Sequence, residues 1–169
     1  MTVKEFIDRV LIGEFKKTQQ EHGHHYVSFS LIGLGIELLG ACLDKHKFDK
    51  KWQSEKRFRK AIRELFPPKY HPYNRKKSDA YLYKHLRCGF AHQGRPGGRI
   101  ALTHRAESRR ENTEHLKDYK GKLILVAEDL FEDFEAACRE VIMSELGSDF
   151  RIEFLRNRNA LWCGACLPI

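Results

Sequence analysis

Residues 81–94, Tyr-Leu-Tyr-Lys-His-Leu-Arg-Cys-Gly-Phe-Ala-His-Gln-Gly, place Arg87 and His92 five positions apart at the expected end of a helix. An imidazole exchanges protons near neutral pH, and a guanidinium stays charged and matches the geometry of a phosphate. Together they suit metal-free RNA cleavage, in which a base takes the 2′-OH proton and a cation stabilises the phosphorane. Residues five apart on an ideal helix point about 140° from each other. The two side chains would therefore converge only if the helix loosens, which Gly89 could permit.

The spacing alone does not single out this pair. With 15 Arg and 9 His residues in the chain, chance placement gives about one Arg-x4-His pair. Three such pairs occur: Arg87/His92, Arg99/His104 and Arg110/His115. The second falls in an expected strand and the third in a charged loop. The first alone follows an apolar helical run and meets a glycine turn.

Helical periodicity predicts the elements that position the pair. Apolar spacing and end signals place helices at 2–20, 26–43, 52–65, 78–90 and 128–146. Thr2 and Glu5 form a capping-box pattern, and Pro67-Pro68 ends the third helix. The second helix is nearly all apolar and is expected at the centre. Its glycines suggest close approach of a neighbouring helix.

Two segments, 99–104 and 121–127, are expected to be strands, and the charged stretch between them an exposed loop. These strands are predicted to form a small β-hairpin. The expected fold class is therefore mainly α, a four- to five-helix bundle with a small β-hairpin inserted near 99–127. A chain of 169 residues is expected to hold one domain, over 1–148, with a C-terminal tail, 149–169, packed on or flanking it.

Charge and composition favour a soluble protein with an anionic partner. The formal net charge is +8 and the pI is near 9.3, which favours an anionic partner such as nucleic acid or a membrane surface. The most apolar run, 29–43, is too short to span a bilayer and contains Glu37, so no membrane association is expected. Five cysteines without a secreted framework pattern favour a reducing, cytoplasmic location.

Basic side chains gather in two parts of the chain and are expected to bind nucleic acid. The candidates are Lys56, Arg57, Arg59, Lys60, Arg75, Lys76, Lys77, Arg95 and Arg99. Tyr70 and Tyr73 lie among them, and rings interleaved with cations suit stacking on single-stranded nucleic acid. The alternative is an ordinary solvated helix face.

Two other groups of residues have metal-like composition. His22, His24 and His25 lack the spacing of a ligand pair on a helix face, so a solvated joint is preferred. Cys163-Gly-Ala-Cys166 has redox or zinc-knuckle spacing without a second pair, and its role stays open. Neither a metal nor a cofactor is predicted.

The segment Leu86-Arg-Cys-Gly-Phe-Ala-His92 resembles the Arg-x4-6-His signature of the HEPN superfamily. The order of elements over about 2–146 is also similar to a HEPN-type bundle with a variable insertion. Many HEPN proteins are metal-independent ribonucleases of toxin, defence or RNA-processing systems, and they commonly pair two Arg/His sites in a homodimer. The resemblance implies that Arg87 contacts the scissile phosphate of RNA and that His92 is the acid or base. It also implies a homodimer and an antitoxin-like nucleotidyltransferase as a partner.

Two functions therefore stay open. The first is a HEPN-like, metal-independent endoribonuclease. The alternative is a non-catalytic HEPN-like domain that binds nucleic acid, a nucleotide or a partner protein. In that case His92 would cap the helix end and Arg87 would pair with Glu37 or another acid. HEPN proteins often place Asn, Asp or His directly after the arginine, whereas this chain has Cys88, a weak hydrogen-bonding residue.

Overall fold

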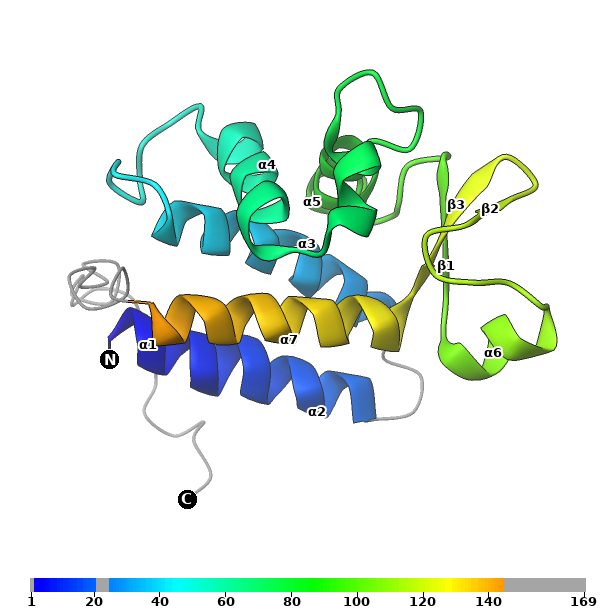
Figure 1. The fold of residues 1–169 in the computed structure, drawn as a ribbon, viewed down its shortest axis with the longest axis horizontal. Coiled ribbons are helices and arrows are strands. Elements are labelled where there is room, and N and C mark those ends of the chain that lie inside the picture. The colour runs from blue at the N-terminus through cyan, green and yellow to red at the C-terminus, as the bar shows by residue number, and fades with distance from the viewer. Residues whose placement is uncertain (1, 21–24, 145–169) are drawn as a thin grey trace.

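The computed structural model describes residues 2–20 and 25–144 and shows a helical bundle with a small sheet at one side (Figure 1). The first helix runs through α1 (Val3–Phe6), the π-helical η1 (Ile7–Glu14) and α2 (Phe15–Gln20). The Glu5 N–H donates to Thr2 Oγ1 at 3.1 Å, and the Thr2 N–H donates to the Glu5 carboxylate at 2.7 Å. The predicted capping box is confirmed.

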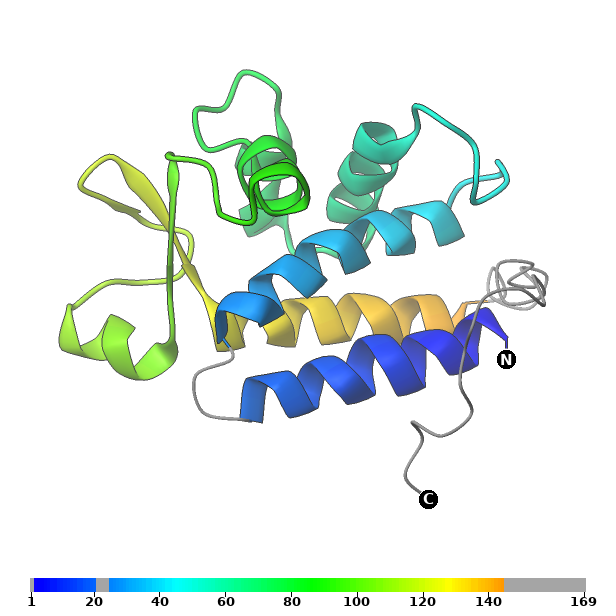
Figure 2. The same ribbon diagram turned by 180° about the vertical axis from the view of Figure 1, so that it is seen from behind.

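Helix α3 (His25–Cys42) is the centre of the bundle. It packs against the first helix and α7 (Ala127–Met143) on one side, and against α4 (Ser54–Leu65) and α5 (Gly89–Gln93) on the other (Figure 2). Its inward side chains Phe29, Ile32, Ile36 and Leu39 are almost completely buried. Burying this much apolar surface is the main stabilising contribution to such a fold. The predicted central position of this helix is confirmed.

Within the described ranges, α3 is the single helix long and apolar enough to cross a membrane. More than half of it, 56%, is buried inside the bundle. A helix that is apolar on all sides and covered by other helices is typical of a protein core. The burial fits a soluble protein, while a cytoplasmic location stays a prediction.

Helix α4 ends at Leu65, as expected, and Phe66 separates it from the two prolines. The stretch after it is more ordered than predicted, because Pro68–Asn74 forms a 3-10 helix, η2. The next helix begins later than residue 78 and consists of the π-helical η3 (Tyr83–Cys88) followed by α5. Gly94, at φ 64°, ends α5, and its N–H donates to the Phe90 carbonyl.

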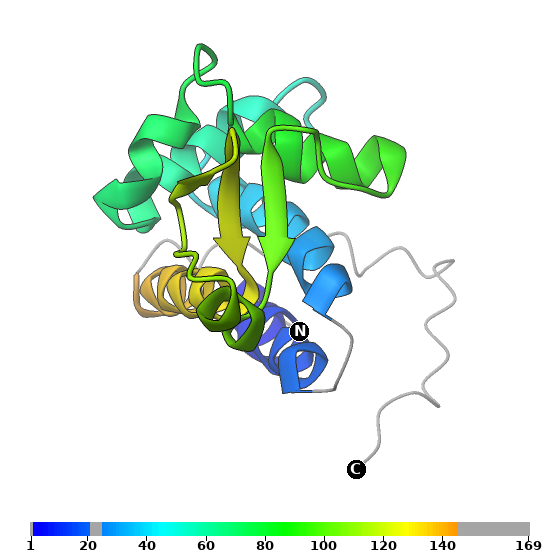
Figure 3. The ribbon, with the colours of Figure 1, turned by 90° about the vertical axis from the view of Figure 1, so that its right-hand side faces the viewer.

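The predicted β-hairpin between 99–104 and 121–127 is wrong. Strand β1 (Ile100–Thr103) pairs with β3 (Lys122–Val126) in parallel, with Thr103 opposite Val126. Parallel strands need a long crossover, and the segment expected to be a loop supplies it with the helix α6 (Arg105–Arg110). Figure 3 shows the two strands side by side, with α6 below their carboxyl ends.

The actual hairpin is smaller and lies at the edge of the sheet. Strand β2 (Asp118–Tyr119) pairs antiparallel with β3, so the strand order is β1-β3-β2. Lys120 and Gly121 join them with φ values of 54° and 75°. Two consecutive left-handed residues make the tight turn whose twist suits a hairpin.

Candidate functional site

Arg87 lies in η3 and reaches across to the central helix. Its Nε donates to Glu37 Oε2 at 2.5 Å, and the two side chains are 18% and 22% exposed. The Ser54 hydroxyl donates to the same carboxylate oxygen at 2.7 Å, and the Tyr83 hydroxyl donates to Ser54 at 3.0 Å. The predicted Arg87–Glu37 ion pair is therefore present, within a hydrogen-bonded chain that links α3, α4 and η3.

The ion pair leaves much of the guanidinium unused. Among the described residues, no hydrogen bond is made by the Nη1 and Nη2 atoms of Arg87. Although partial burial works against the charge, the Glu37 carboxylate raises the pKa of Arg87 above its ordinary value. Burial raises the pKa of the neighbouring Tyr83, which stays neutral. The site thus presents a permanent cation with free donors.

His92 is exposed on α5, one short helical segment beyond Arg87. In the part of the chain that the structure describes, its ring makes no hydrogen bond, so the predicted capping contact is not formed there. The adjoining backbone is held instead by Tyr26 of α3, whose hydroxyl donates to the Gly94 carbonyl at 2.9 Å and whose ring packs edge-on against Phe90. The imidazole is therefore accessible at an anchored helix end.

The helix is loosened where the sequence suggested, but Gly89 has a different role. The Gly89 N–H reaches the Lys84 carbonyl, five residues back, at the end of the π-helical turn. Its own φ is an ordinary helical −54°. A side chain at Gly89 would lie 2.7 Å from the Arg95 carbonyl oxygen and 2.9 Å from the Gly97 nitrogen. The glycine thus lets the 95–97 turn pack directly on the helix that carries Arg87 and His92.

Six of the nine predicted nucleic-acid-binding residues are exposed: Lys56, Arg75, Lys76, Lys77, Arg95 and Arg99. Arg59 and Lys60 are half-buried and donate to backbone carbonyls, of Asn74 at 3.3 Å and Leu43 at 2.5 Å. The exposed set keeps its charge available, apart from Lys76, which pairs with Glu55 at 3.0 Å.

Two residues of the predicted nucleic-acid surface are not at the surface. Arg57 is 5% exposed, and it donates to the Asp44 carboxylate and to the carbonyls of Lys47 and Phe48 at 2.6–2.9 Å. Tyr70 is completely buried. Arg57 therefore holds the α3–α4 connection together, and the Tyr70 ring cannot stack on a base.

Tyr70 belongs to a buried polar chain that the sequence did not reveal. The Val126 N–H donates to His115 Nδ1 at 3.0 Å, so the proton of the neutral ring is on Nε2, which faces the Tyr70 oxygen at 2.8 Å. Tyr70 in turn donates to Asp133 at 2.7 Å, and Lys69 pairs with that carboxylate at 2.6 Å. Burial lowers the pKa of His115 to about 4. His115 is thus a neutral, structural residue.

This burial predicts an acid-sensitive fold. Between pH 6.5 and 4 the unfolded chain protonates His115 and the folded chain does not, so stability falls as the pH falls. We expect a loss of about 2 to 3 kcal/mol between pH 7 and pH 4.5, from about 1.4 kcal/mol per pKa unit. Urea unfolding at the two pH values measures it. The loss should be clearly smaller in His115→Gln, and equal losses in both proteins would contradict the prediction.

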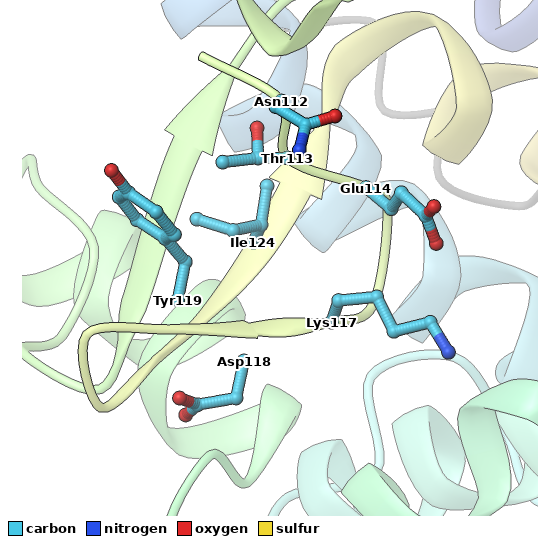
Figure 4. A pocket seen from close by; sticks show the side chains of 7 residues that line it. All are labelled: Asn112, Thr113, Glu114, Lys117, Asp118, Tyr119 and Ile124. Carbon is cyan, nitrogen blue, oxygen red and sulfur yellow. The ribbon is translucent and has the colours of Figure 1, made fainter.

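A surface pocket lies away from Arg87 and His92, between the α6–β2 connection and the sheet edge (Figure 4). It is lined by Asn112, Thr113, Glu114, Lys117, Asp118, Tyr119 and Ile124. None of the predicted site residues is among them. Its side chains offer hydrogen-bonding groups without a nucleophile beside a base, so it is not a candidate catalytic centre.

Comparison of the chain with family models, with curated proteins and with solved structures finds no match. Membership of the HEPN superfamily therefore stays a prediction from residues 86–92 and the order of the helices. The structure places a charged Arg87 on η3 and an exposed His92 on α5, the next segment of the same helical run.

Proposed function

We propose that the chain is a HEPN-like, metal-independent endoribonuclease, active as a homodimer, in a toxin or defence system with a nucleotidyltransferase as its antitoxin. The observation that carries the proposal is the exposed His92 imidazole on the same helical run as Arg87, whose Nη1 and Nη2 atoms have no partner among the described residues. Arg87 of η3 would thus bind the phosphate, and His92 of the adjacent α5 would transfer the proton.

In the proposed reaction, His92 removes the ribose 2′-OH proton and the oxygen attacks the adjacent phosphate. Arg87 binds the non-bridging oxygens and stabilises the negative charge of the phosphorane. Glu37 holds Arg87 through Nε, so Nη1 and Nη2 would be the atoms that bind the phosphate. In a homodimer, the second His92 is available to protonate the leaving 5′-oxygen. The exposed Arg95 and Arg99 follow α5 in the chain and would bind neighbouring phosphates.

Cleavage of varied RNAs in the presence of EDTA tests the proposal. We expect products with cyclic phosphate ends, and a rate reduced about 10²- to 10⁴-fold in His92→Ala and in Arg87→Ala, the usual contribution of such groups. His46→Ala is the matched control, because His46 is also exposed but lies in the α3–α4 connection, at the other end of α3. Circular dichroism of each variant confirms that it is folded.

The Arg87–Glu37 ion pair also favours a second candidate function, a non-catalytic HEPN-like domain that binds nucleic acid, a nucleotide or a partner protein. In that case Arg87 serves to join η3 to α3. RNA binding without cleavage by the wild-type protein would support this alternative. Cleavage that persists in His92→Ala would contradict the proposed site.

A further inference from the structure

Three potential metal ligands from distant parts of the sequence converge at the carboxyl end of the parallel strands. His104 directly follows β1, and Glu128 is the second residue of α7, which begins where β3 ends. Because Thr103 pairs with Val126 in parallel register, these two residues leave the sheet side by side (Figure 3). His25 is the first residue of α3. One ligand atom from each residue lies within 4.8 Å of the others.

The described residues make few hydrogen bonds to these three side chains. The Nδ1 atom of His25 is buried and has no hydrogen-bond partner among the described residues. His104 accepts one long hydrogen bond, 3.4 Å, from the Glu107 N–H. Glu128 accepts through Oε2 from the Arg105 N–H at 2.8 Å, which leaves its second oxygen. A buried nitrogen without a partner costs free energy, and a metal ion is one group that would satisfy it.

We propose that His25, His104 and Glu128 bind a zinc ion. Two imidazoles and one carboxylate are a common set of protein ligands for Zn²⁺ with a fourth position open to water. The mixed nitrogen and oxygen donors do not suit Mg²⁺ or Ca²⁺, which prefer oxygen alone. Bonds of about 2.0–2.2 Å in tetrahedral geometry place ligand atoms about 3.3 Å apart. Zinc binding would therefore require the half-buried ligand atoms to move toward one another by at most about 1.5 Å.

The surroundings favour a cation and orient its ligands. The first turns of α7 are acidic, and the Arg105 side chain neutralises Asp129 and Glu132, not Glu128. The Glu107 carboxylate lies 3.9 Å from His104 Nε2, the ring nitrogen that the α6 cap leaves for a metal, and adds negative charge beside the proposed ion. The His25 and His104 rings are already stacked, with centroids 5.0 Å apart. Binding would tie the start of α3 to the sheet and to α7.

Calorimetric titration of the full chain with Zn²⁺ tests the site, and Co²⁺ substitution reports its ligands. We expect one site that is weakened about 100-fold or more in each of His25→Ala, His104→Asn and Glu128→Gln, since even outer-shell changes cost 10- to 100-fold. Asn at 104 still caps α6, and Gln at 128 still accepts from Arg105, so these variants keep the local fold. Zinc should also raise the melting temperature of the wild type but not of these variants.

His46→Ala is the matched control and should bind zinc as the wild type does. The cobalt complex should show tetrahedral visible bands without a sulfur-to-metal charge-transfer band. Zinc affinity unchanged in His25→Ala and His104→Asn would overturn the proposal, and so would a thiolate spectrum that points to cysteines. The site is independent of the proposed ribonuclease reaction, which is assayed with EDTA, so failure of either proposal leaves the other testable.

Discussion

Replacing Gly40 with alanine is expected to lower the free energy of unfolding by about 3 kcal/mol or more, the upper range for an overpacked core. Gly40 lies where α3 crosses α4, and a Cβ there would overlap the Arg57 carbonyl oxygen. A backbone atom cannot rotate away as a side chain can. The two helices would have to separate, and the buried side chains between them, including Ile36, Leu39 and Phe58, would lose packing.

Gly33→Ala on the same helix is the matched control. A Cβ there would make only ordinary contacts, 3.4 Å to Leu86 Cγ and 3.5 Å to Arg87 Cα. Alanine is favoured over glycine inside a helix by about 0.5–1 kcal/mol, so this variant should be neutral or slightly more stable. Urea unfolding followed by circular dichroism measures both. If Gly40→Ala were as stable as Gly33→Ala, the close helix contact would be incorrect.

Replacing Arg57 with alanine is expected to cost about 3 kcal/mol, because it leaves buried groups without their partner. Arg57 donates to the Asp44 carboxylate at 2.9 Å and to two carbonyls of the α3–α4 connection. Burial alone would raise the pKa of Asp44, yet hydrogen bonds from His46 and Arg57 lower it to about 2. Without Arg57 this carboxylate would lose its guanidinium partner and keep only its hydrogen bonds with His46.

Lys56→Ala controls for the loss of one positive charge on the same helix. Lys56 is exposed, so its replacement should change stability by less than about 0.5 kcal/mol. Comparison of the two variants also separates an effect on stability from an effect on RNA binding. Lys56→Ala should weaken RNA binding modestly without unfolding the chain, whereas Arg57→Ala should act through stability. If the two variants were equally stable, Arg57 would not have a structural role and would belong with the exposed basic residues predicted to bind nucleic acid.

The proposed site shows how one residue can support two functions. Arg87 joins η3 to α3 through Glu37, and its terminal nitrogens make no hydrogen bond to any other described residue. In the proposed reaction, the same contact that stabilises the bundle would hold the guanidinium in place for a phosphate. Within the described structure, the His92 side chain makes no such structural contact. Its replacement therefore tests catalysis more directly than replacement of Arg87.

Patterns among neighbouring residues were sufficient to predict much of the helical bundle. The capping box at Thr2 and Glu5, the apolar central helix and the stop before Pro67 depend on neighbours within a few residues, and each is confirmed. The sequence also offered Glu37 or another acid as a partner of Arg87 in the non-catalytic alternative, and the structure pairs Arg87 with Glu37. These features depend on short-range rules that a sequence displays directly.

Tertiary structure alone decided the pairing of the strands and the fate of several polar residues. Both strands were visible in the sequence, but whether β1 and β3 run parallel depends on how the intervening chain crosses the bundle. That crossing buries His115 against Tyr70 and brings His104 beside His25 and Glu128. Likewise, Arg57 and Lys56 are adjacent in sequence, and only the packing of α4 makes one structural and the other exposed. Contacts between residues far apart in the chain leave no periodic trace, because their partners are chosen by packing and not by spacing.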